Sequence, residues 1–311
     1  GSSHRGHLAR LAPPAAVPLT LRLGTRGSAL ALAQAGLVAE MLEVDVEIVP
    51  IRTSGDAGAA EGDKSRFVKE IEEALLNGDV DLAVHSAKDV PGELPDGLSI
   101  VGVPARADPR DSLCGARSLD ELPAGATVGT SSLRRRAQLL AARPDLDVVE
   151  LRGNVDTRLR KLAEGGYDAL VLAAAGLARL GRDDGEPIAA TLMTPAPGQG
   201  CLALEARTGD EDATLPCAAL TERAALQALT AERAVVAELD ASCRTPLAAY
   251  AEHVDGGLAL SAFVGLPDGS EWIRDRVDGD ADDPAGLGRA AAARLLAAGA
   301  ADVLARAEAL A

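Results

Sequence analysis

The first two-thirds of the chain alternate between short apolar runs, which predict strands, and alanine-rich stretches with helical spacing, which predict helices. A first series predicts strand 19–24, helix 28–42, strand 44–51, helix 67–77 and strand 80–85. A second series begins near residue 111 and predicts strand 127–129, helix 132–142, strand 147–151, helix 155–164 and strand 169–173. This βαβ pattern predicts largely parallel sheets with right-handed crossovers.

The last third of the chain follows a different pattern. A proline- and glycine-rich passage at 195–200 precedes one more strand, 201–206, and we interpret this passage as a segment that crosses between domains. The C-terminal elements are a helix at 222–239, hairpin-like strands at 247–253, 258–264 and 271–277, and a final alanine-rich helix over 284–309. Their order predicts an α+β unit with an antiparallel sheet.

The length of 311 residues is long for one hydrophobic core, so several domains are expected. Residues 1–18 start like an expression tag and continue rich in alanine and proline, which predicts a disordered tag or leader. The predicted domains are a first α/β domain of residues 19–105 plus 200–220, a second α/β domain of residues 106–199, and a C-terminal α+β domain of residues 221–311.

Composition narrows the classes of function. The chain has 31 Lys and Arg against 47 Asp and Glu, a net charge of −16, and 2% of its residues are aromatic. Nucleic-acid binding favours basic surfaces and base stacking needs aromatic rings, so we expect no nucleic-acid partner. No apolar run approaches the roughly 20 residues that span a bilayer, so we expect no membrane partner and a cytoplasmic location.

The cysteines and arginines point to different kinds of site. The four cysteines are Cys114, Cys201, Cys217 and Cys243. They show neither a CxxC pair nor a nearby histidine, so we predict no metal site and no disulfide framework. Arginines, in contrast, concentrate between residues 134 and 160 of this acidic chain. A local basic cleft of this kind suits a small polyanionic ligand.

Polar residues follow several of the predicted strands. Ligands of open α/β sheets bind at such positions, where helix N-termini present unpaired N–H groups. Four segments combine a guanidinium or ammonium group with hydroxyls and backbone donors, and they are 24–28, 85–89, 129–135 and 151–158. This chemistry is suited to carboxylates or phosphates, which arginine can bind in bidentate fashion.

Each segment taken singly also has a purely structural explanation. A Thr-Ser-Ser sequence before a helix is usually a cap, and adjacent arginines usually form a solvated face. His85 is more often a structural histidine than a catalytic one, and Asp89 before Val90-Pro91 is suited to starting a turn. The occurrence of four such junctions in one chain favours a shared binding site.

The ordered motifs make the chain resemble hydroxymethylbilane synthase (porphobilinogen deaminase). The motifs are Thr25-Arg26-Gly27-Ser28, His85-Ser86-Ala87-Lys88-Asp89-Val90-Pro91, Gly129-Thr130-Ser131-Ser132-Leu133-Arg134-Arg135, Arg152-Gly153-Asn154 with Thr157-Arg158-Leu159, Pro197-Gly198-Gln199-Gly200, and Leu239-Asp240-Ala241-Ser242-Cys243-Arg244-Thr245-Pro246. No single motif is decisive, whereas their order from about residue 19 to 250 is highly specific. The resemblance implies two α/β domains like those of periplasmic binding proteins, joined by hinge crossovers, plus a smaller C-terminal α+β domain.

The resemblance also implies an activity and a cofactor. The family consists of transferases of tetrapyrrole (porphyrin and heme) biosynthesis. They condense four porphobilinogen molecules head to tail with release of ammonia, and then hydrolyse the product to linear hydroxymethylbilane. A dipyrromethane cofactor is held as a thioether by one cysteine, which here is Cys243, and Asp89 is the implied catalytic carboxylate. A monomer that acts on the small molecule porphobilinogen, without a metal, is implied.

The resemblance assigns binding of cofactor and substrate to a wider set of residues. These are Arg26, Ser28, Lys88, Thr130, Ser131, Ser132, Arg134, Arg135, Arg152, Arg158, Arg179, Gln199 and Gly200. Lys64 and Phe67 are implied for a lid, although the glycine and lysine pattern around them is not the usual one. The chain also has Ala241-Ser242 before the cysteine, and Ala248 where glycine is common.

Two other interpretations stay open at this point. Two α/β units with crossing segments would also suit a solute-binding protein that closes on an anion. That interpretation predicts no turnover and explains neither Cys243 nor a third domain. The substitutions around Cys243 leave open a diverged family member that acts on a modified pyrrole or lacks full polymerase activity.

Overall fold

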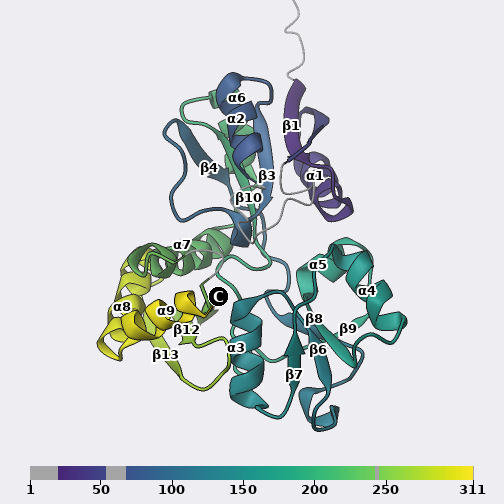
Figure 1. Cartoon of the computed structure of the whole chain (residues 1–311). Helices are drawn as coiled ribbons and strands as arrows, with labels where there is room; N and C mark the ends of the chain where they lie inside the picture. The colour runs from purple at the N-terminus through teal and green to yellow at the C-terminus, as the bar shows by residue number, and fades with distance from the viewer. Residues whose placement is uncertain (1–19, 54–67, 242–244, 311) are drawn as a thin grey trace, which may run out of the picture.

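Three β-sheets organise the chain, and each forms the centre of its own lobe (Figure 1). The structure is a computed structural model that describes residues 20–53, 68–241 and 245–310. Within these residues the two α/β lobes contain five-stranded sheets, and the C-terminal lobe contains a three-stranded one. The predicted α/β fold with a smaller C-terminal α+β domain is confirmed.

The first lobe holds the sheet β2-β1-β3-β10-β4. Its strands are β1 (Thr20–Arg26), β2 (Asp45–Ile51), β3 (Leu82–Ser86), β4 (Leu98–Gly102) and β10 (Leu202–Arg207). Successive residues of β3, such as Ala83 and Val84, point to opposite faces of the sheet. Helices α1 (Ala29–Met41) and α6 (Glu211–Ala219) pack on the Val84 face, and α2 (Lys69–Asn77) packs on the Ala83 face.

The second lobe repeats this strand order in the sheet β7-β6-β8-β5-β9. Its strands are β5 (Asp111–Cys114), β6 (Thr127–Gly129), β7 (Asp147–Val149), β8 (Ala169–Ala173) and β9 (Gly185–Pro187). Helix α3 (Leu133–Ala142) covers one face, and helices α4 (Val155–Ala163) and α5 (Ala174–Arg179) cover the other.

Both sheets are mixed, so the prediction of largely parallel sheets is wrong in part. In the first sheet, β10 lies between β3 and β4 and runs antiparallel to both. In the second sheet, β5 lies between β8 and β9 and runs antiparallel to both. Each of these strands follows a segment that crosses from the other lobe. The residue types within a strand do not indicate the direction in which the strand runs.

Two segments cross between the α/β lobes, residues 103–110 and residues 188–201, and their backbones touch. The N–H of Ala107 donates to the carbonyl of Gly200 at 3.1 Å. Gly200 has φ of +89°, and a side chain there would overlap the Ala107 carbonyl. Gly198 has φ of +73°, and a Cβ there would lie 2.9 Å from the backbone carbon of Ala87. Glycine is required at both positions because of this conformation and this close approach.

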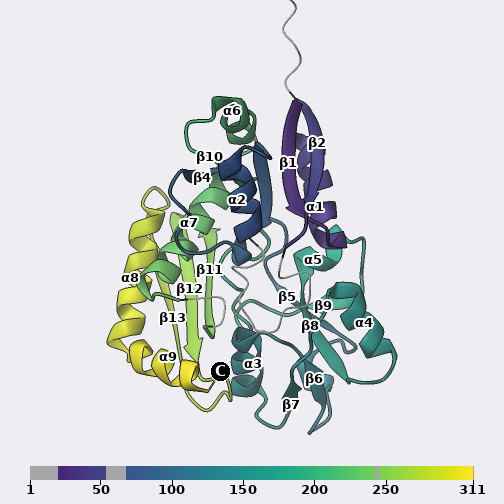
Figure 2. The same cartoon turned by 45° about the horizontal axis from the view of Figure 1, so that its top comes forward.

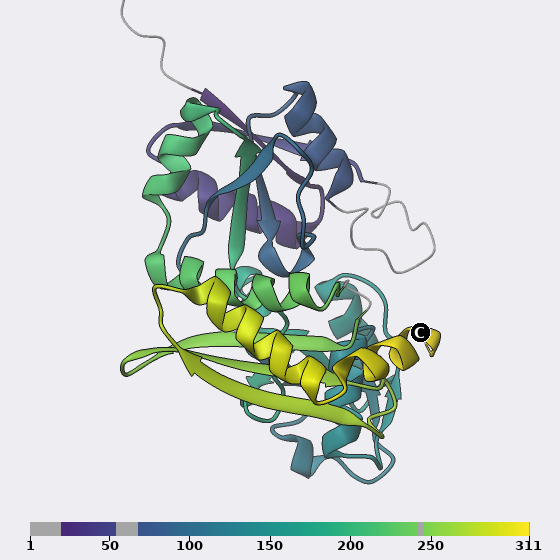
Figure 3. The same cartoon turned by 90° about the vertical axis from the view of Figure 1, so that its left-hand side faces the viewer.

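The C-terminal lobe is an antiparallel sheet with helices on one face (Figure 3). Its strands are β11 (Leu247–Val254), β12 (Gly257–Gly265) and β13 (Trp272–Gly279), and its helices are α7 (Arg223–Glu238), α8 (Pro284–Ala297) and α9 (Ala300–Ala309). The single helix predicted over 284–309 is wrong. Gly299 adopts φ of +100° and ends α8, although alanine-rich sequence continues on both sides.

The C-terminal lobe contacts both α/β lobes, beside which it lies in Figure 2. Towards the second lobe, Phe263 packs on Ala137 of α3, and Arg274 donates to the carbonyl of Thr191 at 2.8 Å. Towards the first lobe, Arg233 of α7 donates to the carbonyl of Pro91 at 2.8 Å. The third lobe therefore bridges the two lobes that carry the predicted binding residues.

Candidate active site

A pocket lies where strands β1 and β3 of the first lobe end. These strands are parallel neighbours, so the residues that follow them meet at one edge of the sheet. Strands β1 and β3, helices α1 and α2 with the residues before them, and the 3-10 turn η2 (Ala87–Asp89) form its walls. The lining residues are Thr25, Arg26, Ser28, Leu30, Ala31, Gln34, Val68, Ile71, Val84, His85, Ser86 and Asp89. The pocket thus brings together Arg26, Ser28 and Asp89 from two separate predicted segments.

Hydrogen bonds around the start of α1 shape this pocket. Ser28 is the N-cap of α1, and its Oγ accepts from the N–H of Ala31 at 3.3 Å. Gln34 of α1 donates from Nε2 to Oγ of Ser86 at 2.9 Å, which connects the helix to the end of β3. Ser28 therefore has the structural role of a cap and also lines the pocket.

Asp89 ends η2, directly after β3, and is half-buried. The crossing segment 188–201 holds this turn in place, because the N–H of Ala87 donates to the carbonyl of Cys201 at 3.1 Å. Its neighbour Lys88 donates from Nζ to Oε1 of Gln199 at 3.2 Å. The side chain of Asp89 therefore lines the pocket, whereas that of Lys88 is bonded to the crossing segment.

The second lobe presents hydroxyls at the start of α3. Oγ1 of Thr130 accepts from the N–H of Ser132 at 3.2 Å, and Oγ of Ser132 caps α3 by accepting from the N–H of Arg135 at 3.4 Å. Ser131 accepts instead from Nη2 of Arg158 at 3.2 Å. The structure therefore brings Ser131 and Arg158 together, although 27 positions separate them.

Arg158 is partly buried, and the charge of Arg135 acts on it. Its Nε donates to the carbonyl of Gly153 at 2.8 Å, which holds the guanidinium in place. Burial and the nearby charge of Arg135 lower the pKa of Arg158 to about 10. Both effects disfavour a positive charge there, so a bound anion would stabilise the arginine and would itself be bound more firmly.

Arg134 and Arg135 are buried and share Asp111 as a partner. Asp111 is inaccessible to solvent, and it lies 2.7 Å from Nη1 of Arg134 and 2.8 Å from Nη2 of Arg135. Arg134 also donates to the carbonyl of Thr194 at 2.8 Å, and Arg135 to that of Val171 at 2.9 Å. Several donors of both arginines are thus already bonded within the protein. Their role in direct carboxylate binding stays a prediction.

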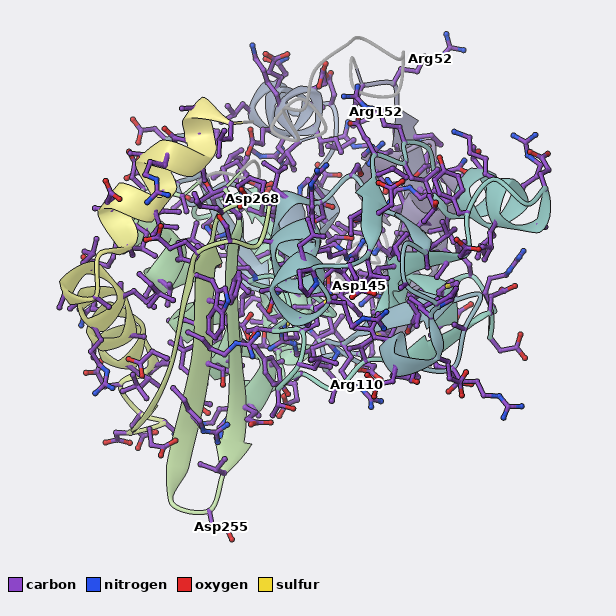
Figure 4. The ribbon with its side chains drawn as sticks, turned by 60° about the horizontal axis from the view of Figure 1, so that its bottom comes forward. Arg52, Arg110, Asp145, Arg152, Asp255 and Asp268 are labelled. Atoms are coloured by element: carbon purple, nitrogen blue, oxygen red, sulfur yellow. The ribbon has the colours of Figure 1, made fainter. Side chains whose placement is uncertain are left out.

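The remaining predicted residues divide between the crossing segments and the surface. Buried Gln199 donates from Nε2 to Asp111 at 2.9 Å, and Arg179 donates to the carbonyl of Gly200 at 2.7 Å. Arg152 is 64% exposed, and its Nε lies 2.6 Å from the carboxylate of Glu150. Figure 4 shows Arg152 at the molecular surface.

Sequence reasoning gave no role to Asp111, to Arg106 or to Glu232, although Glu232-Arg233-Ala234 precedes the cysteine motif of the family. These three residues hold the crossing segments in place. Arg106 donates from Nε to the carbonyl of Gln199 at 2.9 Å and pairs with Glu232 of α7. The available signal for Asp111 was a carboxylate close to the apolar pair Leu113 and Cys114, where burial without a cation is unfavourable. The sequence around Arg106 carries no comparable signal.

Three residues predicted for the site, Cys243, Lys64 and Phe67, lie outside the described residues. The other cysteines are buried. Burial raises the pKa of Cys114 to about 11 and those of Cys201 and Cys217 to about 12. Thiols with such high pKa values are poor nucleophiles at neutral pH.

Comparisons with known proteins show what this chain is similar to. Residues 21–215 match the family described as "Porphobilinogen deaminase, dipyromethane cofactor binding domain", and residues 219–297 match "Porphobilinogen deaminase, C-terminal domain". A porphobilinogen deaminase from Thermus thermophilus is 48% identical over 301 residues, which cover 91% of this chain and 98% of the relative. One from Deinococcus radiodurans is 47% identical over 303 residues, which cover 92% and 98%. A solved structure, the periplasmic sulfonate-binding protein SsuA from Methylobacillus flagellatus KT, is 17% identical with a TM-score of 0.36, and the match covers 70% of this chain and 67% of that chain.

The family models and the curated relatives define a cofactor-dependent transferase. The chain belongs to the porphobilinogen deaminase family. Its reaction is that of hydroxymethylbilane synthase, and its cofactor is dipyrromethane. The predictions of family, activity and cofactor are confirmed, and the solute-binding interpretation is wrong.

The described residues fit a dipyrromethane. Such a group carries carboxylate side chains and pyrrole N–H groups, so it needs cations and a hydrogen-bond acceptor. Arg158 provides a cationic position that an anion would stabilise. Asp89, half-buried in the pocket, provides a carboxylate acceptor.

Proposed function

We propose that Asp89 is the catalytic carboxylate of this transferase and that Cys243 holds the dipyrromethane through a thioether. The observation that carries the first proposal is the position of Asp89 in one pocket with Arg26 and Ser28. A carboxylate there can accept hydrogen bonds from pyrrole N–H groups and hold a proton on Oδ. When bound, the dipyrromethane supplies the pyrrole to which the substrate units are joined.

We assign the binding of carboxylate side chains to donors on both α/β lobes. Arg26 and Ser28 provide them in the first lobe, and Ser131 and Arg158 provide them in the second. The lobes meet beside the pocket, since a Cβ at Gly176 in α5 would lie 3.8 Å from the pocket residue Leu30. A polyanionic chain between the lobes would therefore have cations on two sides.

The other predicted residues have supporting roles in this proposal. Thr130 and Ser132 shape the start of α3, and Arg134 and Arg135 hold α3 against Asp111. A second group connects the crossing segments, and it consists of Lys88, Arg179, Gln199 and Gly200. Arg152 would bind carboxylates from the surface, in competition with Glu150. The lid role of Lys64 and Phe67 stays a prediction.

We further infer that the chain has three separate domains. The first consists of residues 19–105 and 200–220, the second of residues 106–199, and the third of residues 221–311. The division into three sheets supports this inference. We infer a protein that takes porphobilinogen, and the net charge of −16 supports the absence of a nucleic-acid partner. The monomeric state stays a prediction from the resemblance. No helix in the described part of the chain is long and apolar enough to cross a membrane. The cytoplasmic location stays a prediction from the sequence.

Intact-protein mass spectrometry tests the attachment of the cofactor. The purified chain should be heavier than its sequence by two pyrrole units, and Cys243→Ala should lose this mass. Cys201→Ala is the matched control, because burial raises the pKa of that thiol to about 12, and it should keep the added mass. An active wild-type protein without added mass would refute the proposed attachment.

The role of Asp89 is tested with porphobilinogen and the absorbance of oxidised uroporphyrin. Asp89→Asn should lower kcat by roughly 10²–10⁴ and keep the cofactor mass, because the amide cannot take up a proton. Asp96→Asn, at an exposed position of the same lobe, should behave as wild type. A wild-type rate in Asp89→Asn would remove Asp89 from the reaction, and a wild-type chain that yields no uroporphyrin would favour the diverged family member.

A further inference from the structure

The backbone on both sides of Asp89 is attached to other parts of the molecule. Before Asp89, the N–H of Ala87 donates to the carbonyl of Cys201 at 3.1 Å. After Asp89, residues 90–92 belong to neither a helix nor a strand, and Pro91 has no N–H to donate. This segment therefore lacks the regular backbone hydrogen bonds that hold a helix or a strand in place, and its position depends on groups elsewhere in the molecule.

The guanidinium of Arg233 in helix α7 donates to all three carbonyls of this segment. Its Nη2 donates to the carbonyls of Pro91 and Gly92, both at 2.8 Å, and its Nη1 donates to that of Val90 at 3.5 Å. These carbonyls are the hydrogen-bond acceptors that Arg233 has among the described residues. A planar guanidinium can hold several acceptors in one fixed arrangement, whereas the ammonium of a lysine is a single point of charge on a flexible stem.

Apolar side chains of α7 pack against the same segment. Leu229, four positions before Arg233, lies in a core against which Val90 packs. Val236, three positions after Arg233, lies beside Gly92, where a Cβ would be 3.8 Å from Cγ1 of Val236. Residues three or four positions apart share one side of a helix, so a single face of α7 makes all of these contacts.

Asp89 is the residue directly before this segment, and its side chain lines the pocket. Because the backbone is attached two positions before Asp89 and again one to three positions after it, a displacement of residues 90–92 would also move Asp89. Catalysis is sensitive to such a change, since a misplacement of about 1 Å can lower a rate by about a hundredfold. The C-terminal lobe can therefore affect the position of Asp89, although the residues that line the pocket all come from the first lobe.

We propose that Arg233 is a positioning residue of this transferase. It holds the carbonyls of residues 90–92 against helix α7 and thereby fixes the direction in which the carboxylate of Asp89 enters the pocket. Arg233 is not among the lining residues, so it acts through Asp89 and not on the substrate. This inference rests on the catalytic role proposed for Asp89.

The test compares kcat and KM of the full chain, after mass spectrometry has shown that the cofactor is attached. Arg233→Leu should lower kcat by about tenfold to a hundredfold and change KM by less than about threefold, because the donors for substrate carboxylates stay in place. Arg233→Lys keeps the charge without the planar fork, so its kcat should lie between those of Arg233→Leu and the wild type.

Arg207→Leu is the matched control. Arg207 also donates to two backbone carbonyls of the first lobe, those of Leu75 and Val80, at 2.7 and 2.8 Å. It is the last residue of β10, whose first residue, Leu202, pairs with Ser86 near Asp89. Arg207→Leu should be less stable than the wild type in urea unfolding and should keep the wild-type kcat. An arginine that only stabilises the fold would give this same result at position 233.

The double variant Asp89→Asn with Arg233→Leu tests whether Arg233 acts through Asp89. Its kcat should be close to that of Asp89→Asn, because the positioning has no further effect once the carboxylate is lost. A wild-type kcat in Arg233→Leu would overturn the proposal, and so would losses of the two single variants that multiply in the double variant. If Arg233→Leu does not fold, Arg233→Lys takes its place in both measurements. The catalytic role of Asp89 fails or holds separately, because Asp89→Asn alone decides it.

Discussion

Arg106 and Glu232 form a buried ion pair, with 2.6 Å between Nη1 and Oε1. Arg106 belongs to the first crossing segment, and Glu232 belongs to helix α7 of the C-terminal lobe. The same carboxylate accepts from the N–H of Gly198 at 2.6 Å and from that of Ala251 at 2.8 Å. One side chain therefore holds both crossing segments and the first strand of the C-terminal sheet together.

Replacement of Glu232 by alanine should destabilise the fold by about 3–5 kcal/mol, because it leaves the charge of Arg106 buried without its partner. Urea unfolding measures this loss. Glu238→Ala, at the exposed end of the same helix, is the control and should change stability little. The double variant Arg106→Leu with Glu232→Leu should lose less than the sum of the single changes. Equal stability of Glu232→Ala and Glu238→Ala would show that the pair does not hold the lobes together.

Asp111→Asn should also destabilise the fold by about 3–5 kcal/mol at neutral pH, because two buried arginines lose their anion. Burial alone would raise the pKa of Asp111, but Arg134 and Arg135 outweigh it and hold this pKa below its usual range. A carboxyl with a lowered pKa stabilises the fold above its unfolded pKa of about 4 and loses this contribution as the pH falls. The stability difference between wild type and Asp111→Asn, measured by urea unfolding at each pH, should therefore be constant above about pH 5 and shrink as the pH falls from about 5 to about 3. A difference that stays constant over this range would contradict the assignment.

Arg158→Gln should weaken binding of the growing chain by about 1.5–3 kcal/mol, because one charge-assisted hydrogen bond to a carboxylate is lost. Intact mass spectrometry during turnover should then show enzyme that accumulates partly elongated chains. Arg160→Gln, on the exposed side of the same helix, is the matched control and should turn over normally. The same distribution of masses in both variants would exclude Arg158 from binding.

Gly269→Ala should destabilise the fold more than Gly256→Ala. Both glycines have positive φ, +72° and +92°, so each substitution carries a strain of about 1–2 kcal/mol. A Cβ at Gly269 would also lie 2.5 Å from the backbone N of Ala141 in α3, whereas nothing lies within 4 Å at Gly256. In Figure 4, Asp255 marks the open hairpin tip beside Gly256, and Asp268 marks the turn beside Gly269 at the other end of the sheet. Equal losses in thermal unfolding would mean that the turn does not depend on its contact with α3.

Much of the candidate site could be predicted because each of its segments is local. A strand that ends in Arg26 and a helix capped by Ser28 are separated by one residue, and η2 with Asp89 directly follows β3. These features depend on neighbouring residues, whose types are visible in the sequence. The partners of the arginines were not predictable in this way. Asp111 reaches Arg134 only through the arrangement of β5 and α3 in the second lobe.

By itself, the sequence determined most helices and strands, the order of the motifs and, through them, the family. Short-range periodicity and caps carry this information, because backbone hydrogen bonds and side-chain spacing within an element involve residues a few positions apart. Only the tertiary structure decided that β5 and β10 enter their sheets antiparallel, and that Arg134 and Arg135 share one buried carboxylate. It also placed His85 between Glu205 and the Asp89 pocket. Such pairings join residues far apart in the chain, so they depend on strand order and on the packing of helices against sheets.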